Sequence, residues 1–533
     1  MTRRRFFFWF YVFFCFTPFL HTQIINDPND PMYKQIDRWA VQGYITRSLP
    51  QIRPYPLQVI QKLLQEVQIY GNTAAQEKVA WYKKVLQEPV HVGAILRGVG
   101  KNNEQGFFGA PTMDGIITME PWLTGSIALQ VYGSDRLPNN EIKIPETDSP
   151  FNDFVVDAAS LGKFTVMQNW HSTLAIGYDQ LYLQMGLNRS SVGPFYDNGI
   201  VVGPQAGRAG HYSLFYQKGI WSVGVLWLVL AATDDFGKGQ FPNKHVLLRT
   251  IDVKILPNLE LGILESVVWG GRFEMLYLNP FNQYFAAQSM TGFEDNSLFA
   301  LQARWLVVPG LQILGQIYAD DLDFNDMVRL NFNTKYKLAA ELGLRYVHNK
   351  SIFQDVEMNY TAVMPYMYTH INDDYSKRYT PQYPNYFNYT HRGKNLGVDL
   401  EPNSDRLFSK LTFMSFSNAE ISLSGYFTRH GNASEGIHDM TSLNDGTIFD
   451  DGYTTVDTTH PIVTFNGPTR FLTQSVIDYR LAGALSLSWS LPTSFGVFGT
   501  QADYVLEYGW NRNLVKDNNG ITNFWGLSAS WRW

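Results

Sequence analysis

The chain has 533 residues, of which 45% are hydrophobic, 15% are aromatic and only 17% are charged, below the usual quarter or so. Its formal charge of −6 offers no basic surface for nucleic acid, and its single cysteine, Cys15, excludes a disulfide framework and cysteine-based metal sites. Beyond residues 1–23 no apolar run reaches the roughly 20 residues that a membrane-spanning helix needs, so a helical membrane protein is excluded too.

The first residues have the pattern of a secretory signal peptide. Three arginines at positions 3–5 precede an apolar run over residues 6–16, and a charged stretch before a short apolar one is typical of such leaders. A retained membrane anchor is the alternative, but the run is too short to span a bilayer. Lipid modification of Cys15 is a second alternative, and the phenylalanines before it are not the small residues that such a site usually needs. We expect residues 1–23 to be removed on export.

Residues 27–88 are predicted to form three short helices that act as a small cap on a larger domain. The first is capped by Asp30 and stops at Gly43, and the third begins with capping-box spacing between Thr73 and Gln76. The second has an apolar face with helical spacing, formed by Leu57, Ile60, Leu64 and Val67.

From about residue 90 to residue 533 the chain alternates between apolar and polar side chains, which is typical of strands with unlike faces. A soluble sandwich would bury the apolar face in a core, whereas an outer-membrane barrel would turn it toward lipid and the polar face toward the lumen. The exported, aromatic-rich chain favours the barrel. We expect Leu301, Trp305, Leu311, Leu342 and Leu344 to face outward, and Gln302, Arg304, Gln312, Gln316, Lys337, Glu341 and Arg345 to line the lumen.

The last stretch, residues 521–533, alternates in the same way and ends on Trp533. A closing strand with a terminal aromatic residue resembles the signal by which barrel-assembly machinery recognises outer-membrane proteins. Connections are either tight, as at Pro309-Gly310, or long and polar, as at residues 133–153, 370–404 and 431–470. Roughly 440 residues, at about 9–11 per strand plus loops, allow about 14 to 20 antiparallel strands.

Five motifs in a fixed order give a family resemblance over most of residues 30–350. They are "GYDQ" (177–180), "ELGILES" (260–266), "LNPF" (278–281), "EDNSL" (294–298) and "PGLQILGQIYADD" (309–321). This order resembles the capsule assembly Wzi family of outer-membrane β-barrel proteins. The resemblance implies an 18-stranded monomeric barrel in the bacterial outer membrane, with a largely blocked lumen, periplasmic N-terminal helices and extracellular loops. It also implies lectin-like binding or assembly of surface polysaccharide. The long loops depart from the family, so no sugar-contacting residue can be transferred.

One long loop has a composition suited to sugars. Between residues 373 and 393 many tyrosines are interleaved with arginines, and aromatic rings with hydrogen-bonding tips suit sugar rings. The alternative is a loop that packs on its own tyrosines. The candidate glycan contacts are Arg378, Tyr379, Tyr383, Tyr386 and Arg392.

Other polar clusters give no catalytic or metal site. The aspartates of residues 320–326 could hold calcium, but they lack the Gly and Glu of an EF-hand loop, and turn chemistry explains them. Glu265, Glu274, Glu294 and Asp295 could form an acid pair only if they met in the lumen, where charged side chains are ordinary. Neither an H-E-x-x-H nor a G-x-S-x-G motif occurs. We therefore predict no enzyme, cofactor or metal. The resemblance to the Wzi family implies a polysaccharide-binding barrel, and a porin or transport channel for small solutes is the alternative function.

Overall fold

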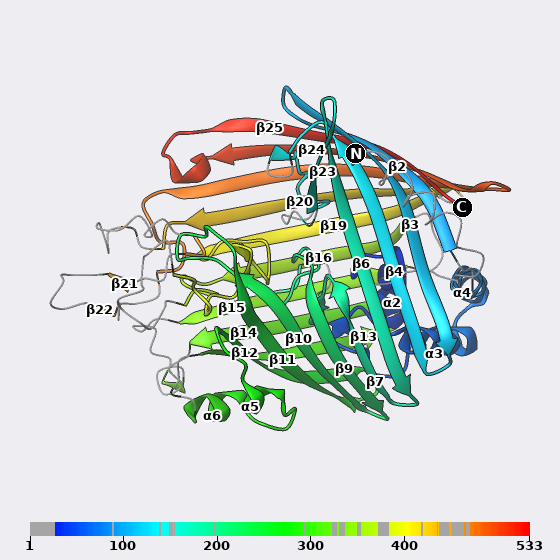
Figure 1. Cartoon of the computed structure of the whole chain (residues 1–533), viewed down its shortest axis with the longest axis horizontal. Coiled ribbons are helices and arrows are strands. Elements are labelled where there is room, and N and C mark those ends of the chain that lie inside the picture. Colours follow the sequence, from blue (N-terminus) through cyan, green and yellow to red (C-terminus); the bar gives the residue numbers. More distant parts are fainter. Residues whose placement is uncertain are drawn as a thin grey trace, which may run out of the picture.

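The computed structural model describes residues 27–87, 90–137, 140–148, 153, 155–195, 198–290, 292, 295–321, 328–329, 336–348, 353–370, 383–416, 419–433, 435, 447–449, 453–454, 463–464 and 470–533. Within these residues, three helices precede a closed β-barrel (Figure 1). No helix in the same ranges is long and apolar enough to cross a membrane.

The barrel is one antiparallel sheet that closes on itself, with 18 strands in its wall among the described residues. An additional short strand, β5 (Val155–Leu161), pairs with one end of β6. The wall strands are β2 (Val90–Lys101), β3 (Glu104–Glu120), β4 (Leu123–Ser134), β6 (Phe164–Tyr178), β7 (Leu181–Asn188), β9 (Ala209–Lys218), β10 (Trp221–Ala232), β11 (Phe241–Leu256), β12 (Leu259–Gly270), β13 (Asn296–Val308), β14 (Leu311–Asp321), β15 (Lys337–Val347), β16 (Phe353–Val363), β19 (Ser404–Phe416), β20 (Ala419–Gly431), β23 (Ile477–Thr493), β24 (Gly496–Trp510) and β25 (Gly520–Arg532).

The last residue of the chain takes part in closing the barrel. β25 pairs with β2 along residues 93–101, and the pairing extends to the terminus. The Val92 amide donates to the Trp533 carbonyl at 3.0 Å, and the Trp533 amide donates to the Val92 carbonyl at 2.8 Å. A closed sheet leaves no edge with unpaired backbone groups, which is a condition for crossing hydrocarbon.

The two ends of the barrel differ in their connections. At one end the strands are joined by tight turns such as residues 121–122, 219–220 and 309–310, and we call this the short-turn end. At the opposite end, the long-loop end, most connections are longer, among them residues 189–208 and 364–403. The three N-terminal helices lie toward the short-turn end, at the right of Figure 1.

Side chains alternate between the outside and the lumen along the wall strands. Leu301, Trp305 and Leu342 are exposed on the outside, and Leu342 is 61% exposed, whereas their neighbours Gln302 and Glu341 are buried inside the barrel. Leu311 and Leu344 are half-buried on the same outer side. An apolar outer face of this kind is the lipid-facing surface of a transmembrane barrel. The expected transmembrane β-barrel with N-terminal helices is therefore confirmed.

The three N-terminal helices begin largely where the capping signals indicate. In α2 (Pro31–Val41), the Asp30 side chain accepts from the Met32 amide at 2.8 Å. In α3 (Leu57–Tyr70), the four residues predicted for the apolar face are all buried. The cap of α4 (Thr73–Val85) is Asn72 and not Thr73, because the Asn72 side chain accepts from the Ala75 amide at 2.9 Å.

The segment between α2 and α3 runs along the inner wall of the barrel. Main-chain carbonyls of this segment accept hydrogen bonds from wall side chains: Ser48 from Gln217 at 2.8 Å, and Leu49 from Arg304 at 3.2 Å. Further along, Gln184 donates to the Pro54 carbonyl at 3.1 Å. The N-terminal region therefore fills part of the lumen as well as covering the short-turn end.

A loop from the opposite end meets this segment inside the barrel. The described parts of this loop, residues 189–195 and 198–208, fold inward, and β8 (Ser191–Val192) pairs with β1 (Ile52–Arg53) as a two-stranded antiparallel sheet. The Gly193 amide also donates to the Gln51 carbonyl at 3.0 Å. Backbone hydrogen bonds in the lumen thus join two segments that enter from opposite ends of the barrel.

The inner face of one side of the wall is apolar. Leu226, Val246 and Leu264 point inward and are almost fully buried against the helices and the inward loops, in one continuous core. The sequence predicts that the polar face of the strands points toward the lumen, and on these three strands that prediction is wrong. The reason is that the inner wall packs against protein here and does not face water.

Replacing Leu342 by arginine should destabilise the folded barrel in a bilayer by about 2–4 kcal/mol, because it places a charge on the lipid-facing side. The matched control is Val515→Arg. Val515 is 56% exposed, similar to Leu342, but it lies in the connection between β24 and β25. Urea titrations in lipid vesicles measure both free energies of unfolding. Equal losses for the two variants would contradict the assignment of this face to lipid.

Candidate functional site

Several of the lumen residues predicted from the sequence contact chain segments that lie inside the barrel. Arg304 is buried and lies 3.4 Å from the Glu260 carboxylate, which also accepts from the Gln51 side chain at 3.0 Å. Lys337 is buried and donates to the Thr369 carbonyl at 3.1 Å. Gln302, Gln316, Glu341 and Arg345 are buried too. Gln312 is half-buried near the start of β14. These side chains therefore mostly contact protein instead of lining an open water path.

Asp37 of α2 lies between the barrel wall and the chain that fills the lumen, which we call the filling. Its carboxylate lies 2.5 Å from Arg53 of the filling and 3.8 Å from Arg345 of β15. The Arg53 side chain is 1% exposed and stacks over the Tyr33 ring, 4.7 Å from its centroid. A guanidinium this deeply buried needs its carboxylate partner, since an uncompensated buried charge is strongly destabilising.

The long-loop end is crossed by residues 383–398, which we call the mouth segment. At one side Asn385 pairs with the loop between β10 and β11, donating from its side chain to Asp235 at 2.5 Å. Lys244 of β11 is fully buried and donates to the Asn388 carbonyl at 2.5 Å and to the Thr390 hydroxyl at 3.1 Å. The segment is thereby fixed to the wall by buried polar groups, each of which would be costly to leave unpaired.

Aromatic rings pack beneath the mouth segment. Tyr389 stacks on Tyr368 with ring centroids 5.8 Å apart, and it meets Tyr318 of β14 edge-on at 5.6 Å. All three rings are buried, and the Tyr318 hydroxyl lies 2.7 Å from the Ser266 hydroxyl. These tyrosines form the inner side of the closure, so they are unavailable to a ligand outside it.

His391 connects the segment to a second side of the wall. Its Nδ1 accepts from the Ala231 amide at 3.0 Å, so Nε2 carries the proton and donates to the Arg208 carbonyl at 3.0 Å. Burial lowers the pKa of His391 to about 4. The ring is therefore neutral at physiological pH and acts as a fixed structural contact.

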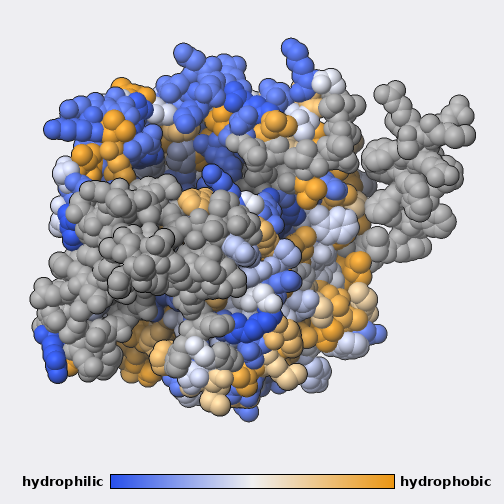
Figure 2. Space-filling view, turned by 60° about the vertical axis from the view of Figure 1, so that its left-hand side comes forward, coloured by the Kyte–Doolittle hydropathy of each residue, from blue (hydrophilic) through white to orange (hydrophobic). Residues whose placement is uncertain are grey.

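The sequence-predicted glycan residues are divided by the structure. Tyr383 is 38% exposed on the mouth segment, and Tyr386 lies half-buried over the Gly270–Gly271 pair, where a β-carbon at Gly270 would overlap its ring. Arg392 is half-buried in the tight turn between β17 (Thr390–His391) and β18 (Lys394–Asn395). Arg378 and Tyr379 lie outside the described residues. Figure 2 brings this end of the molecule forward and shows hydrophilic surface between hydrophobic patches and the grey atoms.

A charged cluster beside the mouth segment was missed by the sequence analysis. Asp153 accepts from Arg189 at 2.7 Å and from the Arg208 amide at 3.0 Å. Burial alone would raise the pKa of Asp153, but Arg189 and Arg208 lower it. Lys143 lies within electrostatic range of Arg189 and Lys394, and also of the carboxylates of Glu141 and Asp148. Cationic and acidic groups are thus interleaved in this cluster, whose members come from three separate loops with no common motif.

The other candidate polar clusters do not form a site. Glu265 points outward and pairs with Arg249 at 2.9 Å, while Asp295 pairs with Arg272 at 2.5 Å. Glu294, Asp323 and Asp326 lie outside the described residues. Within the part of the chain that the structure describes, no group of three or more histidine, cysteine or acidic side chains could hold a metal ion.

The fold has solved relatives of low sequence identity. The structure is similar to Wzi of Escherichia coli, described as an outer-membrane protein involved in group 1 capsule assembly and a carbohydrate-binding β-barrel. The TM-score is 0.58 at 13% identity, over 94% of this chain and 98% of that one. OprD of Pseudomonas aeruginosa matches at 9% identity and TM-score 0.44, over 83% of this chain and 95% of that one. OccAB2 of Acinetobacter baumannii matches at 8% identity and TM-score 0.44, over 83% and 97%.

The two weaker similarities carry no argument about function. No family model matches the sequence, and no curated protein matches it. The comparison with Wzi establishes the architecture of the barrel, and the function has to be argued from the site.

The inward part of the loop between β4 and β5, residues 140–148, should be least protected near pH 7–8. Burial raises the pKa of Glu141 from 4.5 to about 7, so its contribution to stability is present below about pH 4.5 and is lost as the pH rises through 7. Burial lowers the pKa of Lys143 from 10.5 to about 8, so stability is regained as the pH rises from 8 to 10.5. Amide hydrogen exchange, corrected for intrinsic rates, measures this protection.

Glu141→Gln is the control, and it should flatten the acidic branch of the profile while leaving the basic branch in place. A loop whose protection does not change between pH 5 and pH 10 would contradict the burial of the two groups.

Proposed function

We propose that this protein is an outer-membrane barrel that binds polysaccharide at the cell surface, on the outer side of its mouth segment. The observation that carries the proposal is the filling of the lumen from both ends, joined by the β1–β8 pairing. A filled barrel offers solutes no wide aqueous path, which disfavours the alternative of a porin or transport channel. Binding at the outer end, without enzymatic activity, is the role that such an arrangement still permits.

The chemistry of the mouth supports a sugar as the ligand. Tyr383 and Tyr386 offer aromatic faces with hydroxyl tips, a combination suited to sugar rings. Arg392 and Lys394 lie on the same segment, and Arg392 lies within electrostatic range of Arg208. These two cationic side chains of the mouth segment favour a polysaccharide that carries carboxylate or other acidic groups. The structural similarity to Wzi, a carbohydrate-binding β-barrel, is consistent with this choice.

The same proposal gives the protein an orientation and a route to the membrane. Residues 1–23 would be removed on export, residues 27–88 would form a periplasmic helical bundle, and residues 90–533 would form the outer-membrane barrel. The long-loop end would then face the outside of the cell. We propose a monomer that barrel-assembly machinery recognises through the terminal Trp533.

Replacing both Tyr383 and Tyr386 by alanine should weaken polysaccharide binding by about 5- to 100-fold. Each ring contact is worth about 0.5–1.5 kcal/mol, and 1.4 kcal/mol corresponds to a tenfold change in affinity. The purified barrel is first screened against acidic and neutral glycans on an array, and the affinity of a retained glycan is then measured by calorimetry.

The matched control is Tyr178→Ala, which removes an exposed tyrosine at the short-turn end and should leave affinity unchanged. Wild-type protein that retains no glycan, or equal losses in both variants, would contradict the proposed binding surface.

A further inference from the structure

One long connection folds over the outside of the barrel. Residues 271–290, which we call the collar, contain α5 (Met275–Leu278) and α6 (Tyr284–Ser289), drawn at the lower left of Figure 1. Tyr277, Tyr284 and Ala287 pack on wall residues whose side chains point outward. Those wall residues are Leu247, Val267 and Trp269, and they are buried by the contact.

The collar also covers a pair of charges on the outer wall. Arg249 of β11 lies 2.9 Å from Glu265 of β12, and it donates to the carbonyls of Pro280 at 2.6 Å and Asn282 at 3.0 Å. Glu265 accepts from the Phe285 amide at 3.0 Å. Charges on the outside of a barrel are tolerated near the interfaces and are costly at mid-membrane. The collar therefore covers charges that would be costly to expose to hydrocarbon.

The outer side of the collar is strongly apolar. Phe281 is 91% exposed, Met290 is 80% exposed and Met275 is 73% exposed, and Phe273 and Phe285 are more than half exposed. Large apolar side chains gathered this densely mark an interaction surface and not an ordinary water-facing loop. In Figure 2 orange surface gathers along the lower edge of the molecule, toward the place of α5 and α6 in Figure 1.

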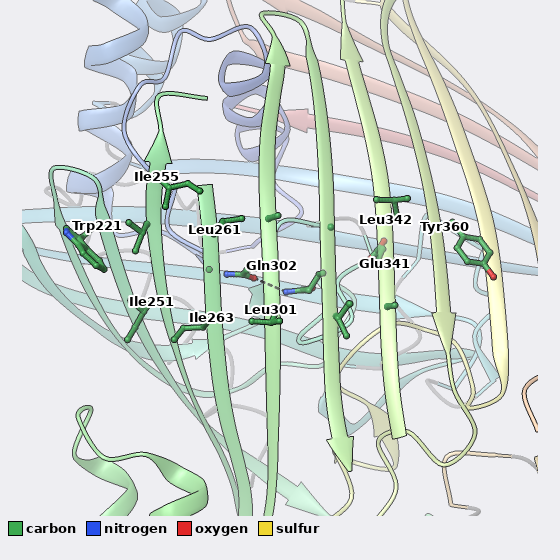
Figure 3. A pocket seen from close by; sticks show the side chains of 17 residues that line it. Trp221, Ile251, Ile255, Leu261, Ile263, Leu301, Gln302, Glu341, Leu342 and Tyr360 are labelled. Carbon is green, nitrogen blue, oxygen red and sulfur yellow. Dashed lines mark hydrogen bonds between the residues drawn. The ribbon is translucent and has the colours of Figure 1, made fainter. Parts of the chain in front are cut away.

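The apolar surface continues from the collar down the outer wall. Successive outward positions on β12 are Trp269 and Val267 beneath the collar, Glu265 at its edge, then Ile263 and Leu261, which line a groove of about 810 Å³. Figure 3 shows this groove, with Ile263 and Leu301 on one side of the sheet, while Gln302 takes part in a hydrogen bond on its other side.

The groove is hollow because small residues form part of its lining. Gly315 and Ala303 are register partners on β14 and β13, and a β-carbon at Gly315 would have no neighbour within 4 Å. Larger residues on either side, including Leu301, Ile317 and Leu342, form its walls. The hollow thus runs across the lipid-facing surface on the same group of strands as the collar.

We propose that the collar and the groove together form a lipid seat. The collar lies in the bilayer leaflet at the long-loop end, with Phe281 and its exposed apolar neighbours among the acyl chains. An acyl chain descending from that leaflet occupies the groove. The occupant is lipid because both features continue the apolar face that the barrel presents to hydrocarbon. This inference rests on the transmembrane architecture and is independent of polysaccharide binding.

The first test places a fluorescent label on the collar. The full-length chain with Cys15→Ser carries Phe281→Cys or Met290→Cys, and Asp517→Cys in the connection between β24 and β25 is the control at the same end of the barrel. The labelled proteins are reconstituted in phosphatidylcholine vesicles that contain a nitroxide lipid. Collar labels should be quenched several-fold more strongly by the nitroxide lipid than the control, and less strongly by aqueous iodide.

Two results would overturn the inference. Collar labels quenched by iodide as strongly as the control would place the collar in water. Energy transfer between labelled copies that rises with the protein-to-lipid ratio, without lipid quenching, would identify a second copy of the chain as the occupant.

The second test fills the groove. Gly315→Leu should lower the number of lipids that remain bound after detergent extraction, as counted by native mass spectrometry. The matched control, Gly483→Leu, adds the same side chain at an exposed position on β23, where a β-carbon also has open space. Unchanged lipid retention in Gly315→Leu would exclude the groove as an acyl-chain site. The collar labels leave the groove unaltered, so they test the proposal even if this variant does not fold.

Discussion

The structure depends on one constraint: in hydrocarbon, every backbone polar group has to find a partner within the protein. The chain meets it by pairing its first wall strand with its last, down to the reciprocal hydrogen bonds between Val92 and Trp533. The sheet therefore has no free edge, and it can be completed only when the final residues are present. Closure also fixes which side of every strand meets lipid, because side chains alternate along each strand. The outer apolar face and the enclosed lumen are both consequences of that single pairing.

A closed wall of this size encloses more space than its own side chains can fill, so its interior holds either water or protein. Here chain enters from both ends. The segment before α3 follows the inner wall from the short-turn end, residues 189–208 descend from the long-loop end, and β1 pairs with β8 where they meet. Inward Leu226, Val246 and Leu264 give this filling an apolar surface, while Asp37 gives it a charged contact with Arg345. The mouth segment closes the outer end over a layer of buried tyrosines, so that its outer side is the surface left for recognition.

The sequence predicts the outside of this molecule better than the inside. Alternation on β13–β15 identifies the strands and their apolar faces, and capping residues identify the starts of the first and third helices to within a residue. On β10 the run "SVGVLWLVLAA" is apolar on both faces, so periodicity could not show that Leu226 and Leu228 point inward. The tyrosines of the mouth segment were equally ambiguous. Tyr389 is buried because its ring packs against Tyr318 and Tyr368, whereas Tyr383 is exposed. That difference depends on contacts between residues distant in the chain. The charged cluster of Lys143, Arg189 and Lys394 likewise exists only after three loops converge.

A filled lumen should block the flow of ions through the barrel, and single-channel recording in planar bilayers measures that flow. The wild-type barrel is expected to insert without producing lasting ohmic current steps. Asp37→Ala removes the carboxylate shared by Arg53 and Arg345, so this variant is expected to show intermittent openings. Large, steady conductance steps from every inserted wild-type barrel would contradict the account and restore the open pore as the better description.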